Sequence, residues 1–367
     1  MRKFEQDSQF DFGIVVSGAH LSDWHGNTLS KIENDGFKIV EKIDNLLMTN
    51  RVTQRSKGVG LLIEGLTQTI EREQPDLLFV VGDREESIAT SVVGNYMNVL
   101  VAHLGGGDPV FGNADDPIRF ACSKLSHIHI VTSKLYAENL IKVGEEDYRI
   151  CNSGNPAYAN IFYTKEIDKI QLSKFLNLDI TNNNFIVLLK HPLSSEVDKS
   201  FEQMKITLDS VKEFAKKHNF KVVGIYPNTD PGSYNILKAI NDFKCENIKF
   251  YKTLPRDIFI NLIRSTNCLV GNSSMGILEA PYYRLPVVNV GNRQKGRLNA
   301  GNVKFVDYIK EDIIEAIESA CFDKAYIEKI NQLENPFGDE TAPDKIIKFI
   351  REINISEKKW YVKTKLC

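Results

Sequence analysis

Short apolar runs alternate with amphipathic helical stretches along most of this chain, and this alternation constrains the fold more than any other feature. Apolar runs followed by helix-period segments favour parallel strands joined by right-handed helical crossovers. The pattern breaks between residues 165 and 184 and then restarts. We therefore predict an α/β protein with two Rossmann-like doubly wound domains, residues 1–164 and 165–340, and a C-terminal helix and tail at 341–367.

The alternation also gives the expected bounds of the individual elements. The expected strands cover residues 12–18, 98–103, 127–132, 148–152, 185–192, 221–228, 248–251, 268–270 and 285–291, and residues 75–84 hold a turn, a buried strand and its polar end. The expected helices cover residues 59–72, 87–96, 117–125, 136–143, 200–218, 234–243, 255–265, 312–320 and 345–354.

Composition excludes several classes of function. The net charge of −2 over 367 residues gives no basic surface for nucleic acid. No apolar run is long enough to span a membrane, and the charged first residues do not resemble a signal peptide. The six cysteines form no C-x-x-C pair, which indicates reduced structural cysteines and no metal site. We expect a cytoplasmic protein without a metal or other cofactor.

The stretch from Gly271 to Glu279 is the first candidate for a binding site. It follows an apolar strand, and Ser273 or Ser274 can cap a following helix by accepting a backbone N–H hydrogen bond. Free N–H groups at a helix start attract phosphate, and the Glu279 carboxylate suits the hydroxyls of a ribose. The alternative is an ordinary capped helix in an α/β domain.

A second candidate segment follows the strand at 285–291. Here Arg293, Lys295 and Arg297 lie around Gly296. Three cations close to a phosphate-binding turn suit a nucleotide diphosphate, whereas the alternative is a solvated basic loop.

Several other strand ends are polar, and in doubly wound sheets ligands bind beyond the carboxyl ends of the strands. These ends carry Asp83, His103, Asp108, His191 and Asn228. Two of these residues, and the nearby Asp115, have an ordinary alternative: Asp83 could form a structural ion pair with its neighbour Arg84, Asp115 could cap a helix before Pro117, and His191 could be a satisfied buried histidine.

Taken together, the motifs resemble one known family. They are Gly82-Asp83-Arg84, Asp115-Asp116 with Ile118-Arg119, His191-Pro192, Pro227-Asn228, Gly271-Asn272-Ser273-Ser274 and Arg293-Gln294. In this order and spacing, over nearly the whole chain, they resemble the UDP-N-acetylglucosamine 2-epimerases. The most similar branch is the hydrolysing one, which makes N-acetylmannosamine for sialic or related nonulosonic acids. The resemblance implies the glycosyltransferase-B fold, a homodimer or homotetramer, and a C-terminal helix that packs back on the first domain.

The resemblance also implies a division of labour. Family enzymes remove the proton on sugar C2 and expel the nucleotide to give a glycal, to which water adds with the opposite configuration at C2. This needs carboxylates at the sugar and cations at the departing diphosphate, without a metal. The implied catalytic residues are Asp83, Asp108, Asp115 and His191. The implied substrate-binding residues are His20, Arg84, His103, Asn228, Ser273, Ser274, Glu279, Arg293 and Arg297.

The chain departs from the family pattern at two places. Gly105 stands where the family motif His-x-Glu-Gly-Gly-Glu has its first acid, while Asp108 matches the second. The family's opening strand, with its Thr-Arg-Ala-Asp-Tyr loop, has no match before Phe12. We therefore expect the central strand of the first sheet to be missing, leaving a groove of unpaired backbone. These departures keep two alternatives open: a catalytically altered nucleotide-sugar binder, or an enzyme of this fold acting on another nucleotide sugar, such as a GDP- or deoxy-sugar.

Overall fold

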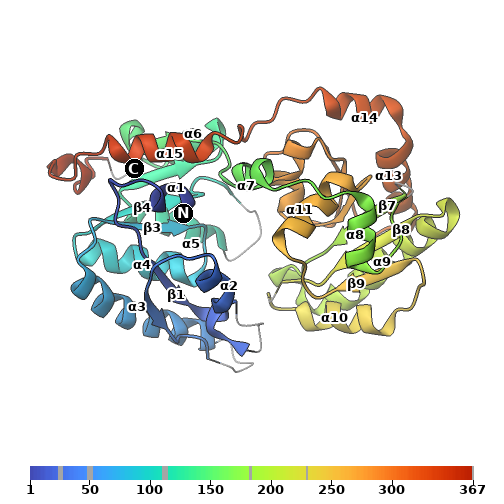
Figure 1. Cartoon of the computed structure of the whole chain (residues 1–367), viewed down its shortest axis with the longest axis horizontal. Helices are drawn as coiled ribbons and strands as arrows, with labels where there is room; N and C mark the ends of the chain where they lie inside the picture. The colour runs from blue at the N-terminus through green and yellow to red at the C-terminus, as the bar shows by residue number, and fades with distance from the viewer. Residues whose placement is uncertain (24–27, 48–52, 110–114, 182–183, 229, 366–367) are drawn as a thin grey trace. The chain divides into compact units, whose positions relative to one another are not determined.

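The computed structural model describes residues 1–23, 28–47, 53–109, 115–181, 184–228 and 230–365. It contains two compact units: unit 1 is built from residues 1–108, 115–154 and 341–367, and unit 2 from residues 155–340 (Figure 1). The segment from Asn155 belongs to unit 2 because its backbone N–H donates to Phe337 O at 2.7 Å. Further along the same segment, Thr164 O accepts from the Arg264 guanidinium at 2.9 Å.

Unit 2 is built on a six-stranded sheet in the order β12-β11-β10-β7-β8-β9, with every neighbouring pair parallel. The chain starts this sheet at its centre with β7, whose five residues are all buried. The strand order therefore reverses between β7 and β10. The strands are β7 (Phe185–Leu189), β8 (Lys221–Ile225), β9 (Ile248–Tyr251), β10 (Leu269–Gly271), β11 (Val287–Val290) and β12 (Val303–Val306).

Helices cover both faces of this sheet, which makes unit 2 a three-layer Rossmann-like unit. One face packs on α9, α10 and α13, and the other on α8, α11 and α12. Local signals set the helix ends: the Asp168 carboxylate accepts from Gln171 N–H at the start of α8, and left-handed Asn219 ends α9. The helices are α7 (Ala157–Tyr163), α8 (Lys169–Leu176), η4 (Ser194–Lys199), α9 (Ser200–His218), α10 (Ser233–Asp242), α11 (Arg256–Ser265), α12 (Met275–Leu278), η5 (Ala280–Tyr283), α13 (Lys310–Phe322) and α14 (Lys324–Asn331).

Unit 1 holds two separate parallel sheets, β1-β2 and β3-β4-β5-β6. Val15 of β1 and Leu78 of β3 pack against the same apolar cluster of α3 and α4. The predicted absence of a central first strand stays a prediction; the structure shows β1 and β3 as edge strands under shared helices. The strands are β1 (Ile14–Ser17), β2 (Ile39–Ile43), β3 (Leu77–Val81), β4 (Leu100–Leu104), β5 (Ile128–Val131) and β6 (Ile150–Asn152).

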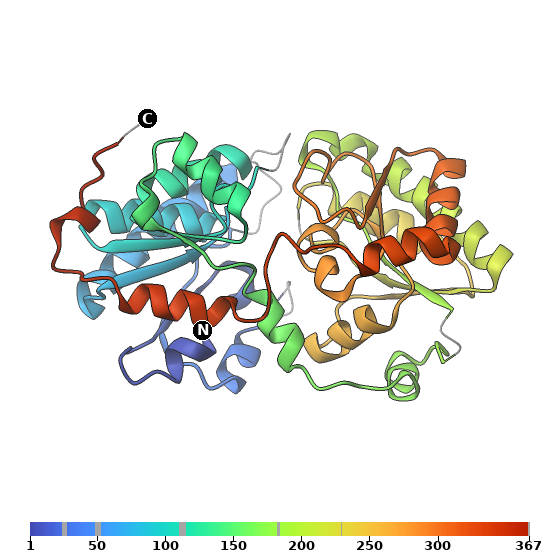
Figure 2. The same ribbon diagram turned by 90° about the horizontal axis from the view of Figure 1, so that it is seen from above.

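The helices of unit 1 include one from the C-terminal part of the chain. Helix α15, red in Figure 2, packs on β4, β5 and β6 through Ile346 and Ile350, and Trp360 joins the same core. The helices are α1 (Arg2–Glu5), η1 (Gly18–Leu21), α2 (Leu29–Asn34), α3 (Thr53–Glu73), α4 (Glu85–Tyr96), α5 (Asp115–Leu125), α6 (Lys134–Lys142), η3 (Asp147–Arg149), α15 (Ala342–Arg351) and η6 (Lys358–Trp360). Across the described residues, no helix is both long and apolar enough to cross a membrane.

A single arginine fixes the C-terminal tail to unit 1. The fully buried Arg149 guanidinium donates to the carbonyls of Trp360 and Val362, each at 2.9 Å, and to that of Lys359. It also donates to His127 O at 3.1 Å, so the tail is held against the start of β5. Losing one donor group would leave several carbonyls without their partner.

We expect Arg149→Met to lower the free energy of unfolding by about 3 kcal/mol or more, because buried carbonyls that lose a charged donor are costly. Urea denaturation would measure the change. Arg72→Met is the matched control, since Arg72 forms exposed ion pairs with Glu41 and Glu73 and should matter little. Equal effects of the two substitutions would contradict the proposed anchoring of the tail.

Candidate functional site

The centre of the candidate site in unit 2 lies where the strand order reverses. His191 follows β7 and Asn272 follows β10, the neighbouring strand. The Asn272 side chain accepts from His191 N–H at 2.7 Å and donates to His191 O at 2.9 Å. Both strand ends are thereby fixed at the point where ligands bind in doubly wound sheets.

The His191 ring is held in one tautomer by the end of β8. Asn228 N–H donates to His191 Nδ1 at 3.0 Å, so the neutral ring carries its proton on Nε2. The Asn228 amide in turn donates to the Asp230 carboxylate at 2.6 Å. His191 can therefore offer an Nε2–H donor to a ligand oxygen.

The loop after β11 is tied to the same asparagine. Arg293 Nη1 and Gln294 Nε2 both donate to Asn272 O, at 3.1 and 3.0 Å. Arg293 also lies 3.9 Å from Asp230, and Arg297 donates to Gln294 Oε1 at 2.6 Å. Arg297 is only 6 % exposed. The alternative of a solvated basic loop therefore does not apply at Arg297.

The helix in the stretch from Gly271 to Glu279 is shorter than a phosphate-binding helix start requires. Helix α12 has only four residues, so its dipole adds little to phosphate binding. Ser273 Oγ accepts from Met275 N–H at 3.4 Å, while the Ser274 side chain makes no capping bond. Glu279 ends α12 and forms an ion pair with Arg256 at 3.2 Å.

Gly271 is required where it stands because β10 and β7 come very close. A Cβ at Gly271 would lie 2.0 Å from Leu189 O. The small residue that the sequence motif showed is therefore explained by strand packing before any ligand is considered.

The candidate site in unit 1 lies at the ends of β3 and β4. The Asp83 carboxylate forms an ion pair with Arg119 of α5, and Arg119 Nη1 also donates to Gly105 O at 2.7 Å. The sequence analysis allowed an ion pair between Asp83 and its neighbour Arg84, whereas the structure shows the ion pair with Arg119. Arg119 was missed as a site residue, although it belongs to the motif that follows Asp115.

His103 lies beneath this loop and not at its surface. Its side chain is 0 % exposed, with Nε2 donating to Gly82 O at 2.7 Å and Nδ1 accepting from Ser123 Oγ at 3.0 Å. Burial lowers the pKa of His103 to about 4, against a smaller opposing effect of the bond to Gly82. The neutral ring positions the Gly82-Asp83 turn, and a direct contact of His103 with substrate stays a prediction.

The other predicted residues of unit 1 are less tightly grouped. Asp108, 5 % exposed, follows the glycine run after β4. His20 is exposed in η1, where its Nδ1 lies 2.6 Å from Thr28 Oγ1, and Arg84 is the N-cap residue of α4. Asp115 begins α5, and its side chain lies outside the described part of the chain.

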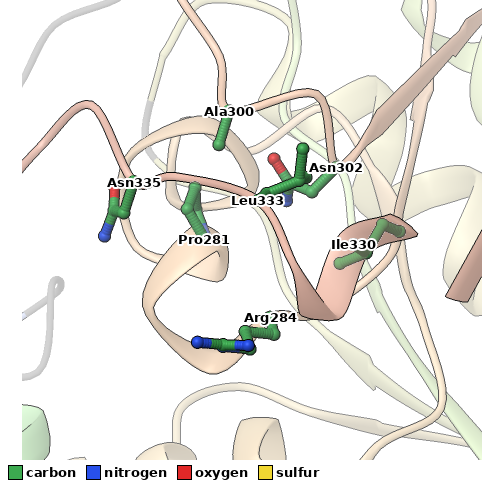
Figure 3. Close-up of a pocket in the computed structure, with 7 residues that line it drawn as sticks. All are labelled: Pro281, Arg284, Ala300, Asn302, Ile330, Leu333 and Asn335. Carbon is green, nitrogen blue, oxygen red and sulfur yellow. The ribbon is translucent and has the colours of Figure 1, made fainter. Parts of the chain in front are cut away.

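A small hollow in unit 2 does not belong to this site. It lies between η5, the end of α14 and the loop near Asn302, and its space of about 180 Å³, part of it open to solvent, leaves no room for the centre of a water molecule (Figure 3). None of the predicted site residues lines it. Its lining residues are Pro281, Arg284, Ala300, Asn302, Ile330, Leu333 and Asn335.

The model of the UDP-N-acetylglucosamine 2-epimerase family matches residues 2–351. The chain belongs to this family.

Two relatives of this epimerase-family chain and one solved structure extend the comparison. The chain is 30% identical to UDP-N,N'-diacetylbacillosamine 2-epimerase (hydrolyzing) of Legionella pneumophila, covering 96% of this chain and 91% of the relative. It is 29% identical to the GDP/UDP-N,N'-diacetylbacillosamine 2-epimerase (hydrolyzing) of Campylobacter jejuni, with the same two coverages of 96% and 91%. UDP-GlcNAc 2-epimerase from Neisseria meningitidis, solved with UDP-GlcNAc, is 21% identical and has a TM-score of 0.82 over 96% of this chain and 95% of its own. The predicted fold class is confirmed.

The neutral His103 of this epimerase-family chain has a measurable consequence. Its folded pKa of about 4 lies below the unfolded value of 6.5, so its contribution to stability is complete above pH 6.5 and is lost as the pH falls through 4. We expect the difference in unfolding free energy between the wild type and His103→Gln to shrink by roughly 2–3 kcal/mol between pH 7 and pH 4. Urea titrations at several pH values would measure it; a difference that stays constant with pH would show that His103 titrates normally.

Proposed function

We propose that this chain is a hydrolysing UDP-N-acetylglucosamine 2-epimerase that converts UDP-N-acetylglucosamine and water into N-acetylmannosamine and UDP. The observation that carries the proposal is the family match, which spans both units and includes the polar strand ends of each. The two relatives described as hydrolyzing 2-epimerases support the same reaction class.

The proposed nucleotide-binding groups are those of unit 2. His191 Nε2–H and the Arg293 guanidinium are donors for the diphosphate, and the network around Asn272 holds both. As the sugar–oxygen bond breaks, negative charge grows on the diphosphate, and such donors stabilise it without reorganising. The remaining contacts proposed here are Asn228, Ser273, Ser274 and Arg297, with Glu279 for ribose.

The proposed sugar chemistry belongs to unit 1. A carboxylate of Asp83, Asp108 or Asp115 takes the proton from C2, the C1–O bond breaks with its electron pair on UDP, and a C1=C2 double bond forms. Water then adds its oxygen to C1, and a proton returns to C2 from the opposite face. Arg119 orients Asp83, while His20 and Arg84 are the proposed polar contacts of the sugar.

A second candidate function is the same chemistry on a different nucleotide sugar. Both relatives described above act, by their names, on N,N'-diacetylbacillosamine carried by UDP or by GDP and UDP. Gly105 supports an altered sugar site or a binder without turnover, because its φ of +89° disfavours the family acid at this position. Assaying one preparation with both UDP-N-acetylglucosamine and a diacetamido nucleotide sugar would separate these functions, because each predicts turnover of a different substrate or of neither.

For the nucleotide site, we expect Arg293→Ala and Ser274→Ala each to weaken UDP binding by about 1–3 kcal/mol, through the loss of a hydrogen bond to a charged group. Isothermal titration calorimetry would measure the affinities. Lys216→Ala is the matched control, since this exposed lysine lies near the C-terminal end of α9, away from the strand ends of the site. Affinities equal to that of the control would overturn the proposed diphosphate contacts.

For the sugar chemistry, incubation with UDP-N-acetylglucosamine in deuterated water should give N-acetylmannosamine labelled at C2, because the returning proton comes from solvent. We expect Asp108→Asn to abolish the product while leaving UDP affinity nearly unchanged, because Asp108 is the carboxylate proposed to replace the acid absent at Gly105, and an amide keeps its shape but cannot take a proton. Mass spectrometry and calorimetry would measure the two effects, with exposed Asp147→Asn as the control. UDP binding without turnover of either a plain or a diacetamido sugar nucleotide would leave the binder as the better account.

A further inference from the structure

Unit 2 buries a lysine at the end of its central strand. Lys190 directly follows β7, is 2 % exposed, and donates from Nζ to the Tyr308 hydroxyl at 2.9 Å. The same Nζ lies 4.6 Å from the centre of the Tyr308 ring. Both contacts are to an uncharged group, whereas a buried ammonium normally needs a counter-charge. Among the described residues, no carboxylate lies within ion-pair distance of Lys190.

The Lys190–Tyr308 pair lies directly beneath the loops of the proposed nucleotide site. Lys190 immediately precedes His191. Tyr308 packs over Gly291, where a Cβ would lie 2.2 Å from the Tyr308 hydroxyl oxygen. Gly291 begins the loop that carries Arg293 and Gln294, so the pair supports both the β7 and the β11 side of the site.

Burial, more than the charged groups nearby, sets the pKa of Lys190. Burial lowers the pKa of Lys190 to about 7, Glu196 of η4 opposes this, and Arg293 adds to it. Burial also raises the pKa of Tyr308, with Glu196 and Asp307 contributing, so the phenol stays neutral. Glu196 of η4 is thus the carboxylate that favours the charged lysine, Arg293 opposes it, and an added anion would favour the protonated form.

We propose that nucleotide diphosphate binding is coupled to proton uptake by Lys190, whose ammonium then supplies counter-charge beneath the loops that hold the diphosphate. This inference rests on the proposed function of unit 2 and deepens it. The proton moves from solvent to Lys190 Nζ, and no covalent bond of the ligand changes. When the sugar–oxygen bond breaks and the diphosphate gains charge, the same ammonium stabilises the departing group.

The sign of the pH dependence follows from linkage. The complex binds more protons than the free protein between pH 7 and the higher pKa that Lys190 has in the complex. UDP affinity should therefore fall as the pH rises above 7, with a slope approaching one decade per pH unit. Below pH 7 the lysine is already protonated, and this slope should disappear.

The test is calorimetry of the full chain with UDP at pH 8, in HEPES, Tricine and Tris, which differ in ionisation enthalpy. The UDP phosphate is fully ionised at this pH because its second pKa is about 6. We expect the wild type and the exposed-lysine control Lys216→Met to take up most of one proton per UDP. The Lys190→Met variant should take up no proton on binding UDP, and its UDP affinity should not fall as the pH rises above 7.

Lys190→Arg gives a second arm that retains a charge. Because arginine stays protonated, this variant should bind UDP without proton uptake. UDP binding to the wild type without uptake, or uptake that persists in Lys190→Met, would overturn the inference and leave the nucleotide site intact. No UDP binding by the wild type would overturn the nucleotide site and this inference together.

Discussion

The hydrogen bonds between the Asn272 side chain and the His191 backbone are the constraint on which the site of unit 2 depends. Strands β7 and β10 stop pairing at this point, and the peptide groups beyond them would otherwise need other partners. The amide of Asn272 supplies both a donor and an acceptor, at 2.9 and 2.7 Å, so it continues the sheet by one step. The backbone carbonyl of Asn272 accepts from Arg293 and Gln294, which links the end of β11 to the ends of β7 and β10.

In unit 1, different residues bind the backbone groups beyond the strand ends. The turn after β3 and the glycine run after β4 are joined by Arg119, which contacts Asp83 and Gly105 O, and by His103, which donates to Gly82 O. Both supporting side chains are buried, and His103 is kept neutral by that burial. In each unit, buried polar groups fix the backbone of the strand ends, and these loops carry the groups proposed to meet the ligand.

The sequence predicts the bounds of some elements to the residue and misses other elements altogether. Helix α9 and strand β9 have the predicted bounds, 200–218 and 248–251. Strands β2 and β12 were missed; Glu41 and Lys42 divide the apolar run of β2, and Lys304 divides that of β12.

The same limit applies to the candidate sites. Asp83, His191 and Asn228 could be proposed because strand ends are visible in the sequence. Arg119, Asn272 and Gln294 matter through partners distant in the chain, such as the Arg119–Asp83 pair, and periodicity carries no information about those contacts.

The glycine at position 105 is connected to the pairing of Asp83. Gly105 has φ of +89°, and a Cβ built there would lie 3.7 Å from Arg119 Nη1. A glutamate at this position would adopt a conformation that L-residues disfavour, and its carboxylate would compete with Asp83 for the same guanidinium. With glycine, the backbone carbonyl alone occupies one side of Arg119, and the other side is left to Asp83. A glutamate at position 105 would therefore weaken the Arg119–Asp83 ion pair as well as add a carboxylate, so the residues at positions 83 and 105 depend on each other.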